Sequence, residues 1–269
     1  MAREKVLAGK TALVTGSARG LGKMAALELA RMGCRIAINY VHSRMEAEQL
    51  AEMIKRQCDV EAIAARGDVS SAADTAELVE RVAGTLGPID VLVNNAGPFI
   101  RERRRFADYG EDEIERLIQG NLLGVLRLDR KVIPHMRERG WGRIIHYGFG
   151  RSMEARGWPH RAVYAAAKVG LVSFTKTLAI EEAEFGITVN MVCPGDIRGP
   201  YKEGHISDAQ GAVDEESPRG RPGTGEDVAR VVTFLCEPSS DYVTGNIIDV
   251  SGGLDPIRYD IHRSNEQKA

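Results

Sequence analysis

Short apolar runs alternate with longer amphipathic stretches along almost the whole chain, and this alternation limits the possible folds more than any other feature. The apolar runs contain few alternating polar residues and cover residues 11–16, 35–40, 61–68, 89–97, 143–147, 187–195 and 246–253. The stretches of helical character cover residues 20–32, 44–57, 72–85, 111–138, 162–185 and 226–236. Strands covered on both faces and alternating with helices predict βαβ units around a parallel sheet, an α/β fold.

The composition excludes several other kinds of protein. Of 269 residues, 43% are hydrophobic and 28% are charged, which suits one α/β domain over residues 1–269 with a tail after about residue 253. The net charge of −2 does not indicate nucleic-acid binding. No signal peptide is apparent, no apolar run approaches membrane-spanning length, and neither cysteines nor histidines show metal-ligand spacing. We therefore expect a cytoplasmic protein without a metal, a membrane segment or a nucleic-acid partner.

The first predicted strand leads directly into a glycine-rich turn. The turn and the start of the next helix contain Gly16, Ser17, Arg19, Gly20, Leu21 and Gly22. Glycines let the backbone turn tightly and approach a pyrophosphate, which a helix N-terminus then stabilises. The same pattern also describes a plain turn, but its place between the first strand and the first helix favours a dinucleotide site.

Tyr164 and Lys168 stand four residues apart in an alanine-rich run that has helical character. This spacing puts both side chains on one face of a helix. A free tyrosine has a pKa of about 10, and a nearby ammonium group is expected to lower it toward neutrality. The pair predicts an acid catalyst, although a tyrosine and a lysine at this spacing are also common on exposed helices.

These features, together with Asn94-Asn95-Ala96-Gly97 and Pro194-Gly195, resemble the short-chain dehydrogenase/reductase family over about residues 8–253. The resemblance implies a Rossmann-type sheet of seven parallel strands in the order 3-2-1-4-5-6-7, with helices on both faces. It implies that Tyr164 protonates a carbonyl oxygen while hydride arrives from a nicotinamide. It also implies that Lys168 holds the nicotinamide ribose and that Asn121 continues a proton relay through water.

The end of the second predicted strand indicates which nicotinamide binds. An acidic residue at this place would hold the ribose 2′-hydroxyl of NAD(H), but residues 39–44 contain none. Arg19 and Arg44, in contrast, could pair with a 2′-phosphate. We therefore expect NADP(H) rather than NAD(H), the alternative being two solvated arginines. The resemblance adds cofactor contacts at Tyr40, Ser43, Asp68, Val69, Asn95, Ala96, Gly97, Tyr164, Lys168, Pro194, Gly195 and Ile197.

A hydroxyl donor that the family places shortly after the fifth strand is missing from its usual position. Counting thirteen residues back from Tyr164 reaches Arg151, whereas counting forward from the strand reaches about Phe149. Ser152 is the nearest hydroxyl, and we expect a bulge of the glycine-rich loop to turn it toward the carbonyl. Arg151, His146 or His160 could substitute for it, or Tyr164 could hold the carbonyl alone.

Within the family, the runs RGLG, YAAAKVGL and VTGNIIDVSGG resemble β-ketoacyl-[acyl-carrier-protein] reductases. This implies a small carbonyl compound or a 3-oxoacyl thioester as substrate and an acyl carrier protein as partner. Two basic residues, Arg137 and Arg139, could dock a carrier. A second group could dock it, could also hold its phosphopantetheine phosphate, or could form only a solvated basic loop: Arg101, Arg103, Arg104 and Arg105. An acidic helix end at residues 181–184 and the lack of a threonine after Ile197 depart from the group. These departures leave open the alternative that the protein is a nucleotide-binding regulator or scaffold with little activity.

Two loops and two long helices carry the remaining expectations. Residues 98–110 and 196–224 follow the ends of predicted strands, so we expect them to be binding loops. The family commonly pairs the helices expected over residues 111–138 and 162–185 between subunits, which implies a homotetramer. These helices carry more apolar residues than one core-facing side needs, unless the sheet alone covers them: Val125, Leu128, Val169, Leu171 and Val172.

Overall fold

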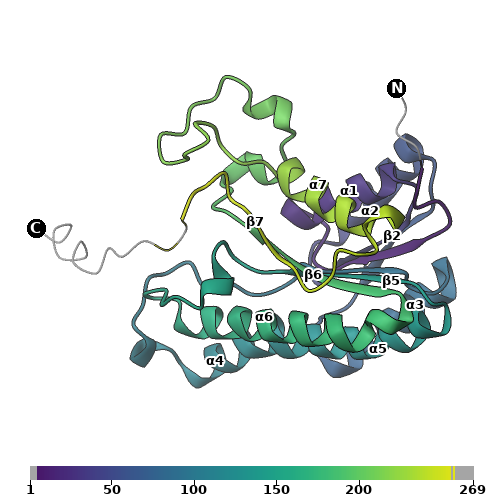
Figure 1. The fold of residues 1–269 in the computed structure, drawn as a ribbon, viewed down its shortest axis with the longest axis horizontal. Coiled ribbons are helices and arrows are strands. Elements are labelled where there is room, and N and C mark those ends of the chain that lie inside the picture. The colour runs from purple at the N-terminus through teal and green to yellow at the C-terminus, as the bar shows by residue number, and fades with distance from the viewer. Residues whose placement is uncertain (1–4, 256, 258–269) are drawn as a thin grey trace, which may run out of the picture.

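A parallel sheet runs through the centre of the molecule (Figure 1). The computed structural model describes residues 5–255 and 257, and its strand order is β3-β2-β1-β4-β5-β6-β7. The strands are β1 (Thr11–Val14), β2 (Arg35–Tyr40), β3 (Ala62–Arg66), β4 (Val91–Asn94), β5 (Gly142–Tyr147), β6 (Ile187–Pro194) and β7 (Ile247–Val250). This confirms the predicted Rossmann-type fold and its strand order.

Helices cover both faces of the sheet. One layer holds α1 (Gly20–Arg31), α2 (Arg44–Cys58) and α7 (Gly225–Cys236); the other holds α3 (Ala72–Leu86), α4 (Glu111–Ile118), α5 (Gly124–Glu138) and α6 (Ala162–Glu182) (Figure 1). Successive side chains of a strand point to opposite faces. Accordingly, Ala12 and Val14 belong to the core beneath α1, and Leu13 belongs to the core beneath α3. The fully buried strands explain why the apolar runs show so little alternation.

The helix expected over residues 111–138 is interrupted. Between α4 and α5 the chain forms one π-helical stretch, Gln119–Leu123, which contains Asn121. Gly120 lies against Pro98, because a Cβ at this glycine would come within 2.4 Å of the proline Cδ. A π-helical turn of this kind is often found at a functional site.

Helix α6 corrects one expectation and qualifies another. The stretch Ala162–Phe185 is long and apolar enough to cross a membrane by length and composition, so the expectation that no run reaches that length is wrong. Half of the stretch is buried, as in the core helix of a globular protein. The apolar residues expected to exceed one core face are mostly covered within the chain itself: Val125, Leu128, Leu171 and Val172 are buried and Val169 is half-buried. The tail expected after residue 253 lies outside the described residues except for 254, 255 and 257.

Candidate active site

A pocket of about 890 Å³ opens where β4, β5 and β6 end. Open α/β sheets bind ligands at this edge. The predicted site residues that line the pocket are Leu21, Asn95, Gly97, Asn121, Tyr164, Lys168, Pro194, Gly195 and Ile197. The structure thus brings the nucleotide-binding and acid-catalyst motifs, which are far apart in the sequence, to one place.

Two asparagines hold the glycine turn against the sheet. Asn39 Oδ1 accepts a hydrogen bond from Gly16 N at 3.1 Å. Asn95 Nδ2 donates to the carbonyl oxygens of Thr15 and Gly16 at 2.8 and 3.1 Å. Because a Cβ on Gly22 would lie 2.6 Å from Asn95 Nδ2, a glycine is required there. Sequence reasoning missed Asn39, although a buried polar residue inside the apolar run RIAINY was a usable indication.

A carboxylate already lies at the N-terminus of α1. Glu203 Oε1 accepts a hydrogen bond from Gly20 N at 2.8 Å, and Glu203 Oε2 pairs with Lys23 Nζ at 2.6 Å. Gly20 has φ +65°, and no heavy atom lies within 4 Å of the place where its Cβ would stand. The N–H group of Gly20 therefore already holds an anion, as a pyrophosphate site requires, and the space beside its Cα is open. Sequence reasoning missed Glu203, which comes from the loop after β6.

The other predicted cofactor residues lie outside the pocket, around the glycine turn and the ends of β2 and β3. Arg19 is exposed, and Arg44 is exposed with its guanidinium 2.8 Å from Glu48 Oε1. Asp68 accepts hydrogen bonds from the backbone and side chain of Ser70. The remaining members of this group are Gly16, Ser17, Gly20, Gly22, Tyr40, Ser43, Val69 and Ala96, none of which lines the pocket.

Lys168 lies close to Tyr164 but is fastened to the backbone. Its Nζ donates to the carbonyl oxygen of Tyr147 at 2.8 Å and lies 5.9 Å from the centre of the Tyr164 ring. Burial raises the pKa of Tyr164 above its usual range and lowers the pKa of Lys168 to about 8. The expected lowering of the tyrosine pKa is therefore wrong here, because desolvation outweighs the nearby ammonium.

Asn121 joins the π-helical turn to the loop after β4. Its Nδ2 donates to the carbonyl oxygens of Pro98 and Leu117 at 2.8 and 3.0 Å. Its Oδ1 is buried and has no hydrogen-bond partner among the described residues. A Cβ at Gly97 would lie 2.3 Å from this oxygen, so the close approach needs a glycine. An unpaired buried acceptor beside the pocket is available to a ligand or a water.

Ser152 does not reach the pocket. It is fully buried at the start of the 3₁₀ turn Ser152–Glu154, and its Oγ lies 3.2 Å from Cys193 Sγ and 3.9 Å from Met191 Sδ. The expected contact with Tyr164 is therefore not formed. The loop does bend sharply, since Arg151, Ala155 and His160 have positive φ, but the bend turns the serine inward.

Phe149 lines the pocket in place of a hydroxyl donor. Its ring centre lies 4.7 Å from that of Trp158 and 6.1 Å from that of Tyr164. Phe99 meets Tyr164 edge-on at 5.0 Å. Aromatic rings thus surround Tyr164. Sequence reasoning did not identify them, because Phe99 comes from the loop after β4 whereas Phe149 and Trp158 come from the loop after β5.

The other candidate donors are engaged elsewhere. His146 is buried between Asp129 Oδ2 and Thr175 Oγ1, each 2.8 Å from a ring nitrogen. The Arg151 guanidinium bonds Glu154 at 2.9 Å. Neither these two residues nor His160 lines the pocket, whereas Tyr147 does, and its buried hydroxyl has no hydrogen-bond partner in the described part of the chain.

The basic residues divide into two groups. Arg104, Arg137 and Arg139 are already paired, with Glu113, Glu182 and Asp90 respectively. Arg101 and Arg103 line the pocket, and their guanidinium groups have no ion pair or hydrogen bond among the described residues. Arg105 is exposed and does not line the pocket.

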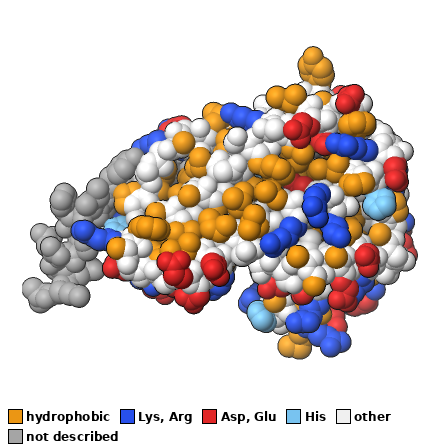
Figure 2. Space-filling model, turned by 90° about the horizontal axis from the view of Figure 1, so that it is seen from below, with side chains coloured by type: hydrophobic (Ala, Val, Ile, Leu, Met, Phe, Trp, Pro, Cys, Tyr) orange, Lys and Arg blue, Asp and Glu red, His pale blue; other side chains and the backbone are white. Residues whose placement is uncertain are grey.

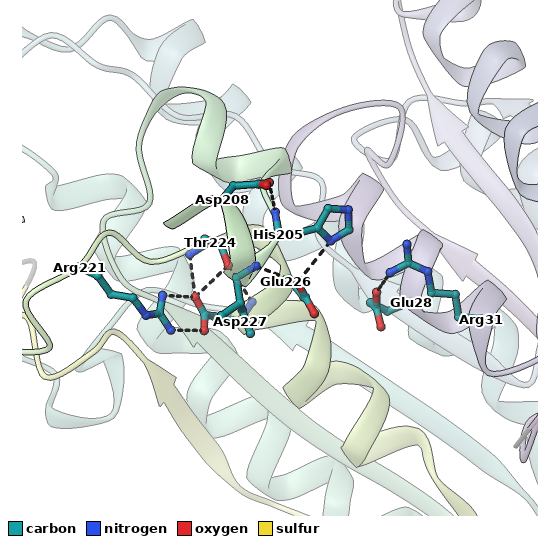
Figure 3. A network of polar contacts seen from close by, with 9 residues as sticks. Glu28, Arg31, His205, Asp208, Arg221, Thr224, Glu226 and Asp227 are labelled. Atoms are coloured by element: carbon teal, nitrogen blue, oxygen red, sulfur yellow. Dashed lines mark hydrogen bonds and ion pairs between the residues drawn. The ribbon is translucent and has the colours of Figure 1, made fainter. Parts of the chain in front are cut away.

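The loop over residues 196–224 closes the pocket from the side of β6 and is fastened to the first turn of α7. Arg221 makes two hydrogen bonds to the Asp227 carboxylate (Figure 3). Thr224 Oγ1 caps the helix by accepting from Asp227 N at 3.2 Å, and Thr224 N donates back to the carboxylate. At the other end of the loop, His205 Nδ1 lies 3.3 Å from Glu226 Oε2 (Figure 3). The loop that contributes Ile197 and Lys202 to the pocket is therefore attached to the start of α7 at two places.

The sheet topology, the glycine turn and the Tyr–Lys pair in one pocket define an α/β oxidoreductase of the class that binds a nicotinamide cofactor. A family model described as enoyl-(acyl carrier protein) reductase matches residues 16–255. The chain belongs to the short-chain dehydrogenase/reductase family, as the motifs predicted.

Curated relatives and solved structures agree with this assignment. The chain is 47% identical to YtkK of Bacillus subtilis, a proposed oxidoreductase, over 91% of this chain and 96% of that protein. It is 38% identical to the 3-oxoacyl-[acyl-carrier-protein] reductase FabG of Staphylococcus epidermidis, over 91% and 98%. A proposed 3-oxoacyl-reductase from Bacillus thuringiensis has a TM-score of 0.86 at 44% identity, covering 93% of this chain and 99% of that one. A blue fluorescent protein from a metagenomic library, solved with NADPH, has a TM-score of 0.80 at 33% identity, covering 92% and 98%.

Proposed function

We propose that this protein is an NADP(H)-dependent reductase of carbonyl compounds in which Tyr164 donates the proton. The observation that carries the proposal is the shared pocket of Tyr164, Lys168 and the nucleotide-side residues Leu21 and Gly195. The similarity to FabG and to a structure solved with NADPH supports it. The similarity to oxidoreductases also favours this reading over a regulator or scaffold with little activity.

The chain's own residues fit a dinucleotide. The α1 N-terminus holds a carboxylate through Gly20 N and faces open space, so it would hold the pyrophosphate. The residues proposed beneath the ribose and nicotinamide are Asn95, Ala96, Gly97, Pro194, Gly195 and Ile197. A reduced nicotinamide, when bound, supplies the hydride for carbonyl reduction.

Each catalytic side chain has a defined task in this proposal. Tyr164 is protonated near neutral pH, because burial raises its pKa, and its Oη gives the proton to the carbonyl oxygen. Lys168 is mostly cationic at pH 7, because its pKa is about 8, and it stabilises the charge that develops on the phenol oxygen. Asn121 holds the loop after β4 against the site and offers its unpaired Oδ1 to a water of the relay.

The pocket offers no serine hydroxyl beside Tyr164, and the other tyrosine in its lining, Tyr147, is buried. Ser152 is turned toward Cys193, and Phe149 occupies the wall beside Tyr164. One oriented oxyanion donor is typically worth about 3–4 kcal/mol. We therefore expect slow reduction of small ketones that fill the pocket poorly, and faster reduction of substrates that the aromatic wall orients.

NADP(H) is proposed over NAD(H) because of the charges near β2. Arg19 and Arg44 are exposed, and residues 39–44 contain no acid. The Arg44–Glu48 pair lies on the surface, where solvent screens such pairs, so a 2′-phosphate can displace it. We propose a carbonyl compound or a 3-oxoacyl thioester as the substrate. We also propose that the protein is cytoplasmic and forms a homotetramer. A carrier protein would rely on Arg101 and Arg103, because Arg137 and Arg139 are paired within the chain.

Titration and turnover test the proposal together. The purified protein is titrated with NADPH and NADH, and NADPH oxidation is then followed with ketones, β-ketoesters and acyl thioesters. We expect tighter binding of NADPH and turnover that falls about 10²–10⁴-fold in Tyr164→Phe while nucleotide binding persists. Equal or reversed affinities would overturn the cofactor assignment. NADPH binding without turnover of any substrate would favour the regulator.

A further inference from the structure

We propose that the pocket is built for an aryl ketone that carries an anionic group, so that an aromatic ring, a carbonyl and a carboxylate or phosphate are recognised together. This inference rests on the proposed reductase function and names the substrate class of the same site. Reduction adds one hydride to the carbonyl carbon and one proton to its oxygen, and it oxidises NADPH to NADP⁺.

The pocket wall around Tyr164 indicates an aromatic ring in the substrate. Phe99, Phe149 and Trp158 all line the pocket and lie within 6.1 Å of the tyrosine ring or of each other, measured between ring centres. Phe99 is 46% exposed even though it faces the pocket beside the acid. A large exposed apolar side chain on the wall of a cleft marks a surface that a ligand covers.

The shape of this wall favours a flat ligand. Trp158 and Phe99 both meet Tyr164 close to edge-on, with interplanar angles of 71° and 82°. Aromatic rings prefer such edge-to-face or offset contacts with another ring, whereas an alkyl chain gains only the area that it buries. A ring bonded directly to the carbonyl would pack between these residues and bring the carbonyl oxygen to Tyr164.

Two arginines at the mouth of the pocket indicate an anionic group in the substrate. Arg101 and Arg103 line the pocket without an ionic partner in the described chain. Arg161 holds their loop in place, because its guanidinium donates to the carbonyl oxygens of Arg101 and Glu102 at 2.7 Å each and lies 5.0 Å from the Phe99 ring centre. The loop is thus fastened beside the aromatic wall with two guanidinium groups free to bind an anion.

The charges on the opposite wall do not cancel this preference. Asp196 lines the pocket, but its Oδ2 is paired with Arg198 Nε and Nη2 at 2.7 and 2.5 Å. Lys202 adds a further positive charge to the lining. A carboxylate on the ring and the phosphate of a carrier-bound acyl chain both suit this mouth, but the carrier-bound chain lacks the ring.

Four ketones separate these features, because they vary the ring and the charge independently. They are 4-acetylbenzoate, its methyl ester, 6-oxoheptanoate and its methyl ester. With NADPH we expect kcat/KM for 4-acetylbenzoate to exceed that of its methyl ester and that of 6-oxoheptanoate by about tenfold each, the effect of one charge-assisted contact or of one well-packed ring. The methyl ester of 6-oxoheptanoate lacks both features, so we expect a difference of about a hundredfold. Equal kcat/KM values for 4-acetylbenzoate and 6-oxoheptanoate would refute the proposed preference for an aromatic ring. Equal kcat/KM values for an acid and its methyl ester would refute the proposed anion site.

Variants with matched controls test whether the arginines at the pocket mouth cause the preference for the acid and whether Phe99 causes the preference for the ring. The double change Arg101→Gln and Arg103→Gln should bring the acid-to-ester ratio to about one, whereas Arg105→Gln, in the same loop but outside the pocket, should leave the ratio as it is. Phe99→Leu should reduce the aryl-to-linear ratio at least threefold, whereas Phe106→Leu, 59% exposed outside the pocket, should not. Equal effects of a variant and its control would overturn the assignment.

Binding separates a failure of this inference from a failure of the proposed function. The affinity of 4-acetylbenzoate for the protein saturated with NADP⁺ is measured by calorimetry, in the parent and in the double arginine variant. Arginine-dependent binding without turnover would keep the inference and refute the reductase. Turnover of neutral linear ketones, with no binding preference for the aryl acid, would keep the reductase and refute the inference.

Discussion

The environment of Tyr164 depends on the residues that come directly after β5. A Cβ at Gly148 would lie 2.7 Å from Cys193 Sγ and 2.8 Å from Met191 Sδ, so the chain leaves the strand through a glycine. Phe149 then enters the pocket, and Ser152 folds back over the same two sulfur atoms. The tight packing at Gly148 therefore decides that Phe149, and not Ser152, lies beside Tyr164.

Ser152→Ala should leave kcat/KM within about twofold of the parent, because the hydroxyl contacts sulfur atoms and no pocket atom. Steady-state NADPH oxidation with any active ketone measures this. A loss of about 10²-fold, the weight of an oriented oxyanion donor, would show that the serine reaches the carbonyl during turnover. Phe149→Ser is the complementary variant, and it should raise turnover of small ketones by placing a hydroxyl in the wall.

The pH dependence of reduction should follow Lys168. Burial lowers its pKa to about 8, so its positive charge is present below that pH and is lost above it. Tyr164 stays protonated over the same range, because burial raises its pKa. We expect kcat/KM to fall as the pH rises through about 8, measured by NADPH oxidation at constant ionic strength. Lys168→Arg should move the fall to higher pH, whereas turnover that increases through pH 8 would contradict this role.

At the scale of elements, the π-helical turn and the loop after β4 fit together only because each contributes glycine. Gly97 lies against the Asn121 Oδ1, and Gly120 lies against Pro98. The hydrogen bonds from Asn121 Nδ2 to Pro98 O and Leu117 O then hold the loop to the helix. The interruption of the helix thus positions Asn121 beside the pocket.

Gly97→Ala should lower the free energy of unfolding by about 1–3 kcal/mol, the usual cost of overpacking, and should reduce turnover by displacing Asn121. Urea denaturation and NADPH oxidation measure the two effects. Gly84→Ala is the matched control, because Gly84 lies in α3 with no atom within 4 Å of the added Cβ. It should be neutral or stabilising by about 1 kcal/mol. Equal destabilisation by both changes would refute the steric argument.

The segment Gly199–Glu203 and helix α1 are joined at the place proposed for the pyrophosphate. Glu203 and a bound pyrophosphate would compete for Gly20 N and Lys23. Glu203→Ala should therefore lower the Kd of NADPH about three- to tenfold, measured by calorimetry. Glu215→Ala, an exposed acid of the same loop, should leave the Kd unchanged. A weaker affinity in Glu203→Ala would instead show that the contact shapes the site for the cofactor.

For the whole molecule, the layer formed by α4, α5 and α6 presents an apolar outer surface. Figure 2 shows this side, the lower one in Figure 1, with hydrophobic side chains gathered across its central part. Ile180 on α6 is 80% exposed, and Leu122 and Leu126 are only partly covered by the chain's own core. These residues, rather than those expected from the sequence, are available to a subunit interface.

We expect light scattering to give a mass of four chains of 29.4 kDa each. Ile180→Asp should lower that mass, because it places a charge in the proposed interface, while circular dichroism stays unchanged. Met45→Asp is the control, since Met45 is 68% exposed on α2 in the opposite layer. A parent protein that is monomeric at micromolar concentration would refute the tetramer.

The sequence by itself determined the α/β class, the glycine turn with Leu21, and the Tyr164–Lys168 pair. These follow from local patterns, because a strand buried on both faces needs a continuous apolar run, and a turn or a helix face needs no distant partner. The strand order and the places of Asn95 and Gly195 in the site were implied by the resemblance to the family, and the structure brings all five residues to one pocket.

The tertiary structure alone decided what surrounds those residues. The direction of Ser152 depends on Cys193 and Met191, which lie about forty residues further along the chain. The pKa of Tyr164 depends on how much water its neighbours exclude, and the site of Glu203 depends on a contact between β6's loop and α1. Such contacts join parts of the chain that no local pattern connects, because they arise only when the packed sheet brings its loops together.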